Sequence, residues 1–284
     1  MSRILLIGAT GTIGRHVAAQ LAAAGASVRA LVRNPETAHL PPQIELAPGD
    51  LRTPESLDRP LQGVDAVFLI WTTPPQSVAS VIARIAANAQ RIVYLSAPFK
   101  TPHPFFQQPN PARTLGENIE RTIESSRLQW TFLRPGMFAA NALTWWAPQI
   151  REGQVIRWPY LSAATAPIDP RDIATIACRA LSDTSLADVD YVLTGPESLT
   201  QLEQLTTIGR VLGRNLAIEE MTPEETHREW AATWPEPVID MLLSAWAAAV
   251  DLPAFISETF EQLTASRPHT FEQWAASHAQ DFQS

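Results

Sequence analysis

The fold is decided by the stretch Ile4-Leu5-Leu6-Ile7-Gly8-Ala9-Thr10-Gly11-Thr12-Ile13-Gly14. Its apolar first part has the length of a buried strand, and the glycines after it lead into a helical stretch from Arg15 to Ala24. A strand, a glycine-rich turn and a helix in this order are typical of the first βα unit of a dinucleotide-binding domain. A βα turn that holds no ligand is the alternative interpretation.

The glycine-rich turn has the features that bind a pyrophosphate. Glycine permits a tight turn and a close approach of the backbone to the phosphates, while a helix N-terminus offers free N–H groups and the positive end of its dipole. We therefore expect cofactor contacts from Gly8, Thr10, Gly11, Thr12, Ile13 and Gly14.

The second predicted strand, Ser27 to Arg33, indicates which cofactor is bound. In an NAD-binding protein a carboxylate is expected near its end, about 20 residues past the glycines. This chain has Arg33 and Asn34 there, and no Asp or Glu before Glu36. A guanidinium binds a 2′-phosphate through charge-assisted hydrogen bonds, whereas a carboxylate repels it. The sequence thus favours NADP(H) over NAD(H); the alternative is a solvated surface arginine.

Composition limits the class of protein. With 284 residues, 45% of them hydrophobic, the chain can bury the core of one α/β domain and a smaller lobe. The net charge of −8 at pH 7 opposes binding to nucleic acid, which depends on clustered cations. We expect no metal site, because Cys178 is the only cysteine and no cluster of ligands is evident.

The sequence also bears on location. No window approaches the roughly 18 apolar residues of a transmembrane helix, and the chain enters its first strand without a basic segment or a cleavage site. We expect a cytoplasmic protein with no membrane partner.

Short apolar strands alternate with helical stretches along the first half of the chain. Further strands are predicted at Ile44 to Leu46, Ala66 to Trp71, Arg91 to Ser96 and Trp130 to Gly136. This alternation predicts an α/β fold with a doubly wound parallel sheet of the Rossmann type. Residues 1–135 are predicted to form the dinucleotide-binding domain, and residues 136–284 mainly a smaller, discontinuous C-terminal substrate lobe, with some segments returning to the sheet.

Ligands of an open α/β sheet bind outside the carboxyl ends of its strands. Asp50 follows the third predicted strand, and we expect it either to contact the adenine or to cap a turn or helix. Residues after the fourth and fifth strands should border the nicotinamide half. The further cofactor contacts expected at this edge are Asp50, Leu51, Trp71, Thr72, Ser96 and Pro135.

A segment rich in proline and aromatic residues runs from Phe99 to Pro111. Its prolines, at 102, 104, 109 and 111, predict an irregular loop that forms a lid or a pocket wall. Aromatic side chains in this loop and in the early second lobe suit a flat apolar substrate, although aromatic residues mostly fill cores. The expected substrate pocket consists of Phe99, Phe105, Phe138, Trp145, Trp146 and Trp158.

Several segments together resemble the NmrA-like atypical short-chain dehydrogenase/reductases. They are Gly8–Gly14, Val32–Pro35, Thr131–Phe138, Ile168–Ala174, Thr194–Glu197 and Arg267–Trp274. The resemblance implies a Rossmann domain with a discontinuous substrate lobe that binds NADP(H). Members of this family range from NADPH-dependent quinone, azo-dye and triphenylmethane reductases to redox sensors without demonstrated turnover.

The usual catalytic pair is missing. Standard short-chain reductases place a Tyr and a Lys four residues apart on one helix face, and the phenol donates a proton to the substrate. The only lysine here is Lys100, and Glu117 and Arg121 occupy the places of the pair. These two residues are expected to form a surface ion pair, the alternative being a catalytic Glu117. The candidate proton donors are therefore Glu117, His103 and Tyr160.

These observations predict an NADPH-dependent oxidoreductase that transfers hydride to a small aromatic or conjugated acceptor of the quinone, azo, enone or imine type. Charge in such acceptors is delocalised, so that water can supply the proton. The alternative is a non-catalytic NADP(H)-binding redox sensor. The helix-rich tail, Pro237 to Leu263, is expected either to cover the pocket or to form the surface of a homodimer.

Overall fold

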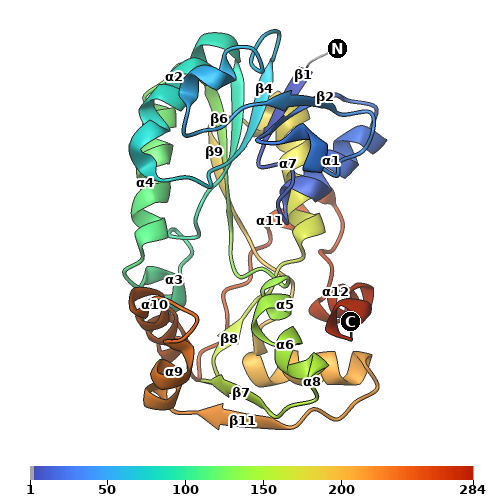
Figure 1. The fold of residues 1–284 in the computed structure, drawn as a ribbon, viewed down its shortest axis with the longest axis vertical. Coiled ribbons are helices and arrows are strands. Elements are labelled where there is room, and N and C mark those ends of the chain that lie inside the picture. Colours follow the sequence, from blue (N-terminus) through green and yellow to red (C-terminus); the bar gives the residue numbers. More distant parts are fainter. Residues whose placement is uncertain (1–2, 284) are drawn as a thin grey trace. The chain divides into compact units, whose positions relative to one another are not determined.

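The computed structural model describes residues 3–283, which fall into two compact units (Figure 1). The first unit contains the residues up to Ala97, Pro111–Pro135 and Pro170–Tyr191. The second contains Pro98–Asn110, Gly136–Asp169 and the residues from Val192 onward. Residues 98–110 therefore group with the second unit, whereas a single boundary at residue 135 would leave them in the first.

The first unit is built on a seven-stranded sheet with the strand order β3-β2-β1-β4-β5-β6-β9. Pairing from β3 through to β6 is parallel throughout, which confirms the predicted Rossmann-type α/β fold. The third strand lies slightly later in the chain than predicted. The strands are β1 (Arg3–Ile7), β2 (Ser27–Val32), β3 (Glu45–Pro48), β4 (Ala66–Ile70), β5 (Arg91–Leu95), β6 (Gln129–Pro135) and β9 (Val189–Leu193).

Helices cover both faces of this sheet, with α2 and α4 on one face and α1 and α7 on the other (Figure 1). Because both faces are covered, the central strands are almost continuously apolar and buried, as the pattern of β1 shows. The Gln20 side chain of α1 donates to the carbonyl of Arg171 in α7 at 3.0 Å, which joins these two helices. The helices are α1 (Gly14–Ala23), α2 (Val78–Asn88), α4 (Pro111–Glu124) and α7 (Pro170–Ser182).

Prolines open two helices in the segment that was predicted to be an irregular loop. Pro104 begins the short helix α3 (Pro104–Gln107), and Pro111 begins α4. Proline fits the first position of a helix because its missing N–H would have no partner there and its φ angle is already helical. The prediction that these prolines exclude regular structure was therefore wrong.

The second unit is mostly helical and has its own core, which is rich in tryptophan. Two small sheets support it, one pairing β7 with β11 in parallel and the other pairing β8 with β10 antiparallel. Its strands are β7 (Ile156–Pro159), β8 (Ala164–Thr165), β10 (Leu199–Thr200) and β11 (Ile218–Met221). Its helices are α3, α5 (Asn141–Trp145), α6 (Ala147–Arg151), α8 (Gln201–Val211), α9 (Pro223–Trp230), α10 (Glu236–Ala247), α11 (Thr259–Thr264) and α12 (Phe271–Ser277).

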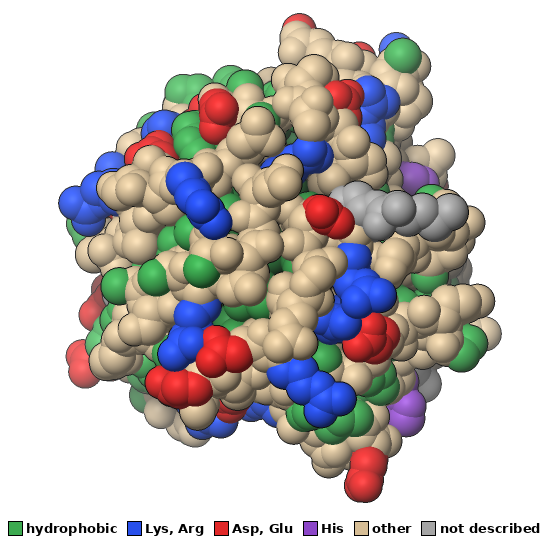
Figure 2. Space-filling view, turned by 90° about the horizontal axis from the view of Figure 1, so that it is seen from above, with side chains coloured by type: hydrophobic (Ala, Val, Ile, Leu, Met, Phe, Trp, Pro, Cys, Tyr) green, Lys and Arg blue, Asp and Glu red, His purple; other side chains and the backbone are tan. Residues whose placement is uncertain are grey.

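Charged side chains of both signs are interspersed on the face shown in Figure 2. That face therefore carries no broad field of one sign, the feature by which basic proteins attract nucleic acid. Within residues 3–283, no helix is both long and apolar enough to cross a membrane.

Candidate functional site

The glycine-rich turn joins the carboxyl end of β1 to the start of α1. Gly8 has a φ of +91°, a conformation that side chains disfavour, and the amide of Gly11 donates to its carbonyl at 3.1 Å. Ile13 is the N-cap residue of α1, and its side chain makes no capping hydrogen bond. The first turn of α1 is therefore free of a side-chain cap, as an anion-binding helix N-terminus requires.

Gly14 allows α1 to pack directly on the turn. A Cβ atom at this position would lie 2.1 Å from the carbonyl oxygen of Gly8 and 2.8 Å from the Cα of Ala9. At Gly11, by contrast, a Cβ atom would meet that same oxygen at 3.4 Å, which is close to an ordinary contact. Gly14 is thus required by helix packing, whereas the space beside Gly11 suits a bound phosphate.

Arg33 and Asn34 follow β2 at the same edge of the sheet, and both are exposed. The Asn34 side chain accepts a hydrogen bond from the amide of Glu36 at 3.0 Å and so caps a short 3-10 helix, Pro35–Thr37. Arg33 directly follows β2, the strand paired with β1, and the ribose of a dinucleotide is expected at this place in the fold. Arg33 and Asn34 are thus the residues at this strand end that could contact the adenosine ribose of a dinucleotide.

Asp50 follows β3 and is bound by a neighbouring arginine. Its carboxylate accepts a hydrogen bond from the amide of Arg52 at 2.9 Å and forms an ion pair with the Arg52 side chain at 2.6 Å. These hydrogen bonds hold the pKa of Asp50 below its usual range, with a smaller contribution from the charge of Arg33. The structure thus gives Asp50 the turn-capping contact that was one of its two expected roles.

The other residues expected at this edge differ in exposure. Thr72 is exposed, and Trp71 is partly buried with its indole N–H donated to the carbonyl of Thr73 at 2.6 Å. Ser96 is buried, and its amide donates to the Leu133 carbonyl at 2.7 Å. Leu51 and Pro135 are buried, which leaves their backbone atoms as the parts best suited to contact a ligand.

Glu117 lies on α4 with a different partner from the one predicted. Its Oε1 pairs with Nε of Arg113 at 2.9 Å, while Nε of Arg121 donates to the backbone carbonyl of Glu117 at 3.3 Å. The expected side-chain pair between Glu117 and Arg121 is thus replaced by a pair one turn toward the N-terminus. The Glu117 carboxylate is therefore held in an ion pair along its own helix.

Tyr94 of β5 does not replace the missing tyrosine either. Burial, followed by the nearby charge of Glu120, raises the pKa of the Tyr94 phenol well above its usual value. Glu120 itself is buried and forms a two-point ion pair with Arg134 of β6, at 2.6 and 3.0 Å. Arg134 also pairs with Asp190, so this charged cluster serves to anchor α4 to the sheet.

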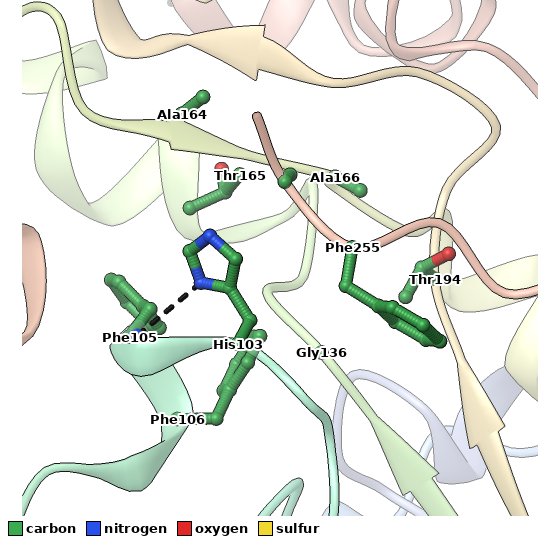
Figure 3. Close-up of a pocket in the computed structure, with 10 residues that line it drawn as sticks. His103, Phe105, Phe106, Gly136, Ala164, Thr165, Ala166, Thr194 and Phe255 are labelled. Carbon is green, nitrogen blue, oxygen red and sulfur yellow. Dashed lines mark hydrogen bonds between the residues drawn. The ribbon is translucent and has the colours of Figure 1, made fainter. Parts of the chain in front are cut away.

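The second unit contains a small, partly open recess. Figure 3 shows the His103 ring among its lining residues, with Nδ1 hydrogen-bonded to the Phe105 amide. That bond, at 3.3 Å, places the proton of a neutral ring on Nε2. The lining residues are His103, Phe105, Phe106, Gly136, Ala164, Thr165, Ala166, Thr194, Ala254 and Phe255.

His103 is the residue of this recess that carries a ring nitrogen, Nε2, among mostly apolar side chains. Its side chain is buried, and Nε2 has no hydrogen-bond partner within residues 3–283. Burial lowers the pKa of His103, and the nearby backbone carbonyl of Pro253 partly opposes that effect. The ring is therefore neutral at pH 7, and Nε2 is an N–H donor in mostly apolar surroundings.

The expected aromatic pocket residues divide into recess and core. Phe105 lines the recess, and Phe99 is buried outside it. Trp146 and Trp158 are buried and pack edge to face, with ring centroids 5.8 Å apart, in the core of the second unit. Beside that core lie the partly buried side chains of Trp145 and Tyr160, while Phe138 is also partly buried.

Two arginines near the nucleotide edge were missed by the sequence analysis. The Arg15 side chain lies over the glycine-rich turn, with its guanidinium 3.4 Å from the carbonyl oxygens of Gly11 and Thr10. Arg52 holds Asp50, as described above. Both are cations placed one or two residues beyond a motif residue, which is the only signal the sequence contained.

A parallel sheet with an uncapped glycine-rich turn at the end of its central strand defines the class of Rossmann dinucleotide-binding proteins. The model of a family described as NAD(P)H-binding matches residues 8–184. The chain belongs to this NAD(P)H-binding family, in its NmrA-like, atypical short-chain dehydrogenase/reductase branch.

Two relatives match this chain along almost its whole length. A (4-alkanoyl-5-oxo-2,5-dihydrofuran-3-yl)methyl phosphate reductase from Streptomyces griseus is 37% identical over 287 residues, covering 98% of this chain and 99% of the relative. An NAD(P)H azoreductase from Xenophilus azovorans is 31% identical, with the same coverage. 

Solved structures share the fold. The NADPH-dependent quinone oxidoreductase of Escherichia coli superposes with a TM-score of 0.79 and 22% identity, covering 96% of this chain and 98% of that one. The triphenylmethane reductase of a Citrobacter species, solved with NADP(H), gives a TM-score of 0.80 and 22% identity, covering 98% and 100%. These matches and the two relatives confirm the predicted family, the Rossmann fold and the class of NAD(P)H-dependent reductase.

Proposed function

We propose that this protein is an NADPH-dependent reductase of a small conjugated acceptor, and that it works without the Tyr and Lys pair of standard short-chain reductases. The observation that carries the proposal is the glycine-rich turn with Arg33 at the neighbouring strand end. It is supported by two full-length relatives named as reductases, one of an alkanoyl furanone phosphate and one an azoreductase.

The residues of this chain fit an NADP(H) molecule at the edge of the first unit. The amides of the turn from Gly8 to Gly14 would hold the pyrophosphate, and Arg33 with Asn34 would hold the ribose 2′-phosphate. Asp50, Leu51, Trp71, Thr72, Ser96 and Pro135 complete the proposed contacts. When bound, the reduced nicotinamide supplies the hydride, which carries two electrons to the acceptor.

A conjugated acceptor needs little acid catalysis. Charge that develops in a quinone, azo, enone or imine group is delocalised, so that one proton from water completes the two-electron reduction. His103 is the proposed hydrogen-bond donor toward the acceptor, because its neutral ring lines the recess and carries its proton on Nε2. The aromatic residues Phe99, Phe105, Phe138 and Trp145 are the proposed walls of the acceptor site.

The test measures cofactor binding and turnover with the purified full chain. NADPH and NADH are titrated by nicotinamide fluorescence, and a quinone, an azo dye and an enone are then added while absorbance of the reduced cofactor is followed. Tighter binding of NADPH and acceptor-dependent oxidation support the proposal. Tight binding without oxidation by any acceptor would favour a redox sensor instead.

A further inference from the structure

The edge formed by β2 and β3 brings an ion pair next to Arg33. The amide of Gly49 donates to the carbonyl of Val32 at 3.0 Å, so the chain leaves the two strands side by side. Arg33 directly follows Val32, the last residue of β2, and Asp50 comes two residues after Pro48, the last residue of β3. Asp50 therefore lies within one residue of the level of Arg33 at this edge, and the charge of Arg33 contributes to lowering the pKa of the Asp50 carboxyl.

The Arg52 side chain binds the Asp50 carboxylate through two of its nitrogen atoms, Nε and Nη2. Its Nε lies 3.1 and 3.2 Å from the two oxygens of Asp50, and its Nη2 lies 2.6 Å from Oδ2. The backbone amide of Arg52 also donates to Asp50 Oδ1 at 2.9 Å, which fixes the turn. Asp50 has 22% of its side chain exposed and Arg52 has 63%, so the pair lies at the surface where a cofactor would bind.

The charges at this edge determine whether it attracts or repels a phosphate group. With Arg52 in place, the charge of Asp50 is balanced and Arg33 gives the edge a net positive charge. Without Arg52, the carboxylate would repel a 2′-phosphate and would compete with it for Arg33. The Asp50 carboxylate stays charged at neutral pH with or without Arg52, because the usual pKa of an aspartate is only about 3.9.

We propose that Arg52 is a positioning residue for cofactor selectivity, which favours NADPH by neutralising Asp50 beside Arg33. This inference rests on the proposed function, since it requires NADP(H) to bind at this edge. NADH has no 2′-phosphate, so its binding should depend little on the charge of Asp50. A purely structural role of Arg52 would affect both cofactors alike.

The first experiment compares NADPH and NADH affinities of the Arg52→Gln variant by calorimetric titration. Arg52→Gln should weaken NADPH binding roughly three- to tenfold and change NADH binding by less than about twofold, as expected for one unbalanced surface charge near a phosphate. Arg52→Lys keeps the cation and should recover most of the NADPH affinity. Equal weakening of both cofactors would overturn the proposal.

The second experiment repeats the substitution without the carboxylate. In an Asp50→Asn background, Arg52→Gln should leave the NADPH affinity unchanged, because no charge remains to be neutralised. The same loss of NADPH affinity in that background would overturn the proposal, since Arg52 would then act on the phosphate directly.

The Arg33→Gln variant separates this inference from the proposed function. Lost selectivity in Arg33→Gln together with unchanged selectivity in Arg52→Gln would overturn the role of Arg52 alone. Unchanged selectivity in both variants would overturn the NADPH assignment together with the role of Arg52.

Discussion

Arg33 is the single residue on which the cofactor assignment depends. Its exposed guanidinium follows β2, where a carboxylate would serve NAD. The Arg33→Gln variant should bind NADPH about tenfold more weakly, because a charge-assisted hydrogen bond to phosphate is lost. NADH affinity should be unchanged, and fluorescence titration of both cofactors measures the ratio. Equal affinities of wild type and variant for NADPH would contradict this prediction.

His103 should make stability depend on pH. Burial lowers its pKa in the folded protein, so the unfolded chain binds a proton at higher pH than the folded chain does. The free energy of unfolding is therefore highest above a pH of about 6.5, the pKa of a histidine in the unfolded chain. It decreases as the pH falls below that value, because protonation then favours the unfolded state. The urea midpoint of the wild type should therefore drop between about pH 7.5 and pH 5.5.

The matched control for this prediction is His103→Asn. Asparagine is a good N-cap residue and can accept the hydrogen bond from the Phe105 amide, but it does not titrate. The variant should lose a smaller part of its stability over the same pH interval. An identical pH dependence in both proteins would show that His103 is not the group responsible.

At the scale of elements, the contact between β1 and α1 depends on Gly14. A Cβ atom there would lie 2.1 Å from the Gly8 carbonyl oxygen, so Gly14→Ala should destabilise the protein by about 1–3 kcal/mol and abolish tight cofactor binding. Gly11→Ala meets the same oxygen at 3.4 Å and should keep the stability while weakening cofactor binding. Thermal unfolding and NADPH titration separate the two effects, and equal stability losses would contradict them.

Helix α4 should depend on its buried ion pair. Glu120 and Arg134 are almost fully buried, so Glu120→Gln removes one of the two carboxylates that bind Arg134, leaves only the pair with Asp190, and should cost about 2 kcal/mol of unfolding free energy. The matched control is Glu117→Gln on the same helix, where the half-exposed pair with Arg113 should be worth at most about 1 kcal/mol. Urea unfolding measures both, and similar costs would contradict the role of Glu120.

Elements with a strong local pattern could be predicted, and those set by side-chain partners could not. The run from Ile4 to Gly14 consists of a short apolar segment and a glycine-rich turn. This local pattern was sufficient to predict strand β1 and helix α1. The predicted ion-pair partner of Glu117 was wrong. Arg113 and Arg121 each lie four residues from Glu117, on either side of it, and sequence spacing alone does not distinguish them. Pro104 was misread because proline ends a helix interior but suits its first position.

At the scale of the whole molecule, the sequence could indicate a discontinuous second lobe but not its core. The expectation that Trp146 and Trp158 line a pocket came from their position after the sixth strand, whereas both are buried within the second unit. Which tryptophans enter a core depends on contacts between residues distant in the sequence, such as the hydrogen bond from Trp158 to Gln201 at 2.5 Å. Local patterns carry no information on such contacts.

The central claim is that this protein uses NADPH to reduce a conjugated acceptor. Its most direct test uses NADPH that carries deuterium at both C4 positions of the nicotinamide. An enone or a cationic triphenylmethane dye is added as an acceptor that takes the hydride on carbon. Oxidation of the cofactor is followed, and the reduced product is analysed by mass spectrometry. We predict oxidation only when acceptor is present, with one deuterium retained on carbon in the product. Tight NADPH binding with no oxidation by these acceptors, by quinones or by azo dyes would contradict the claim.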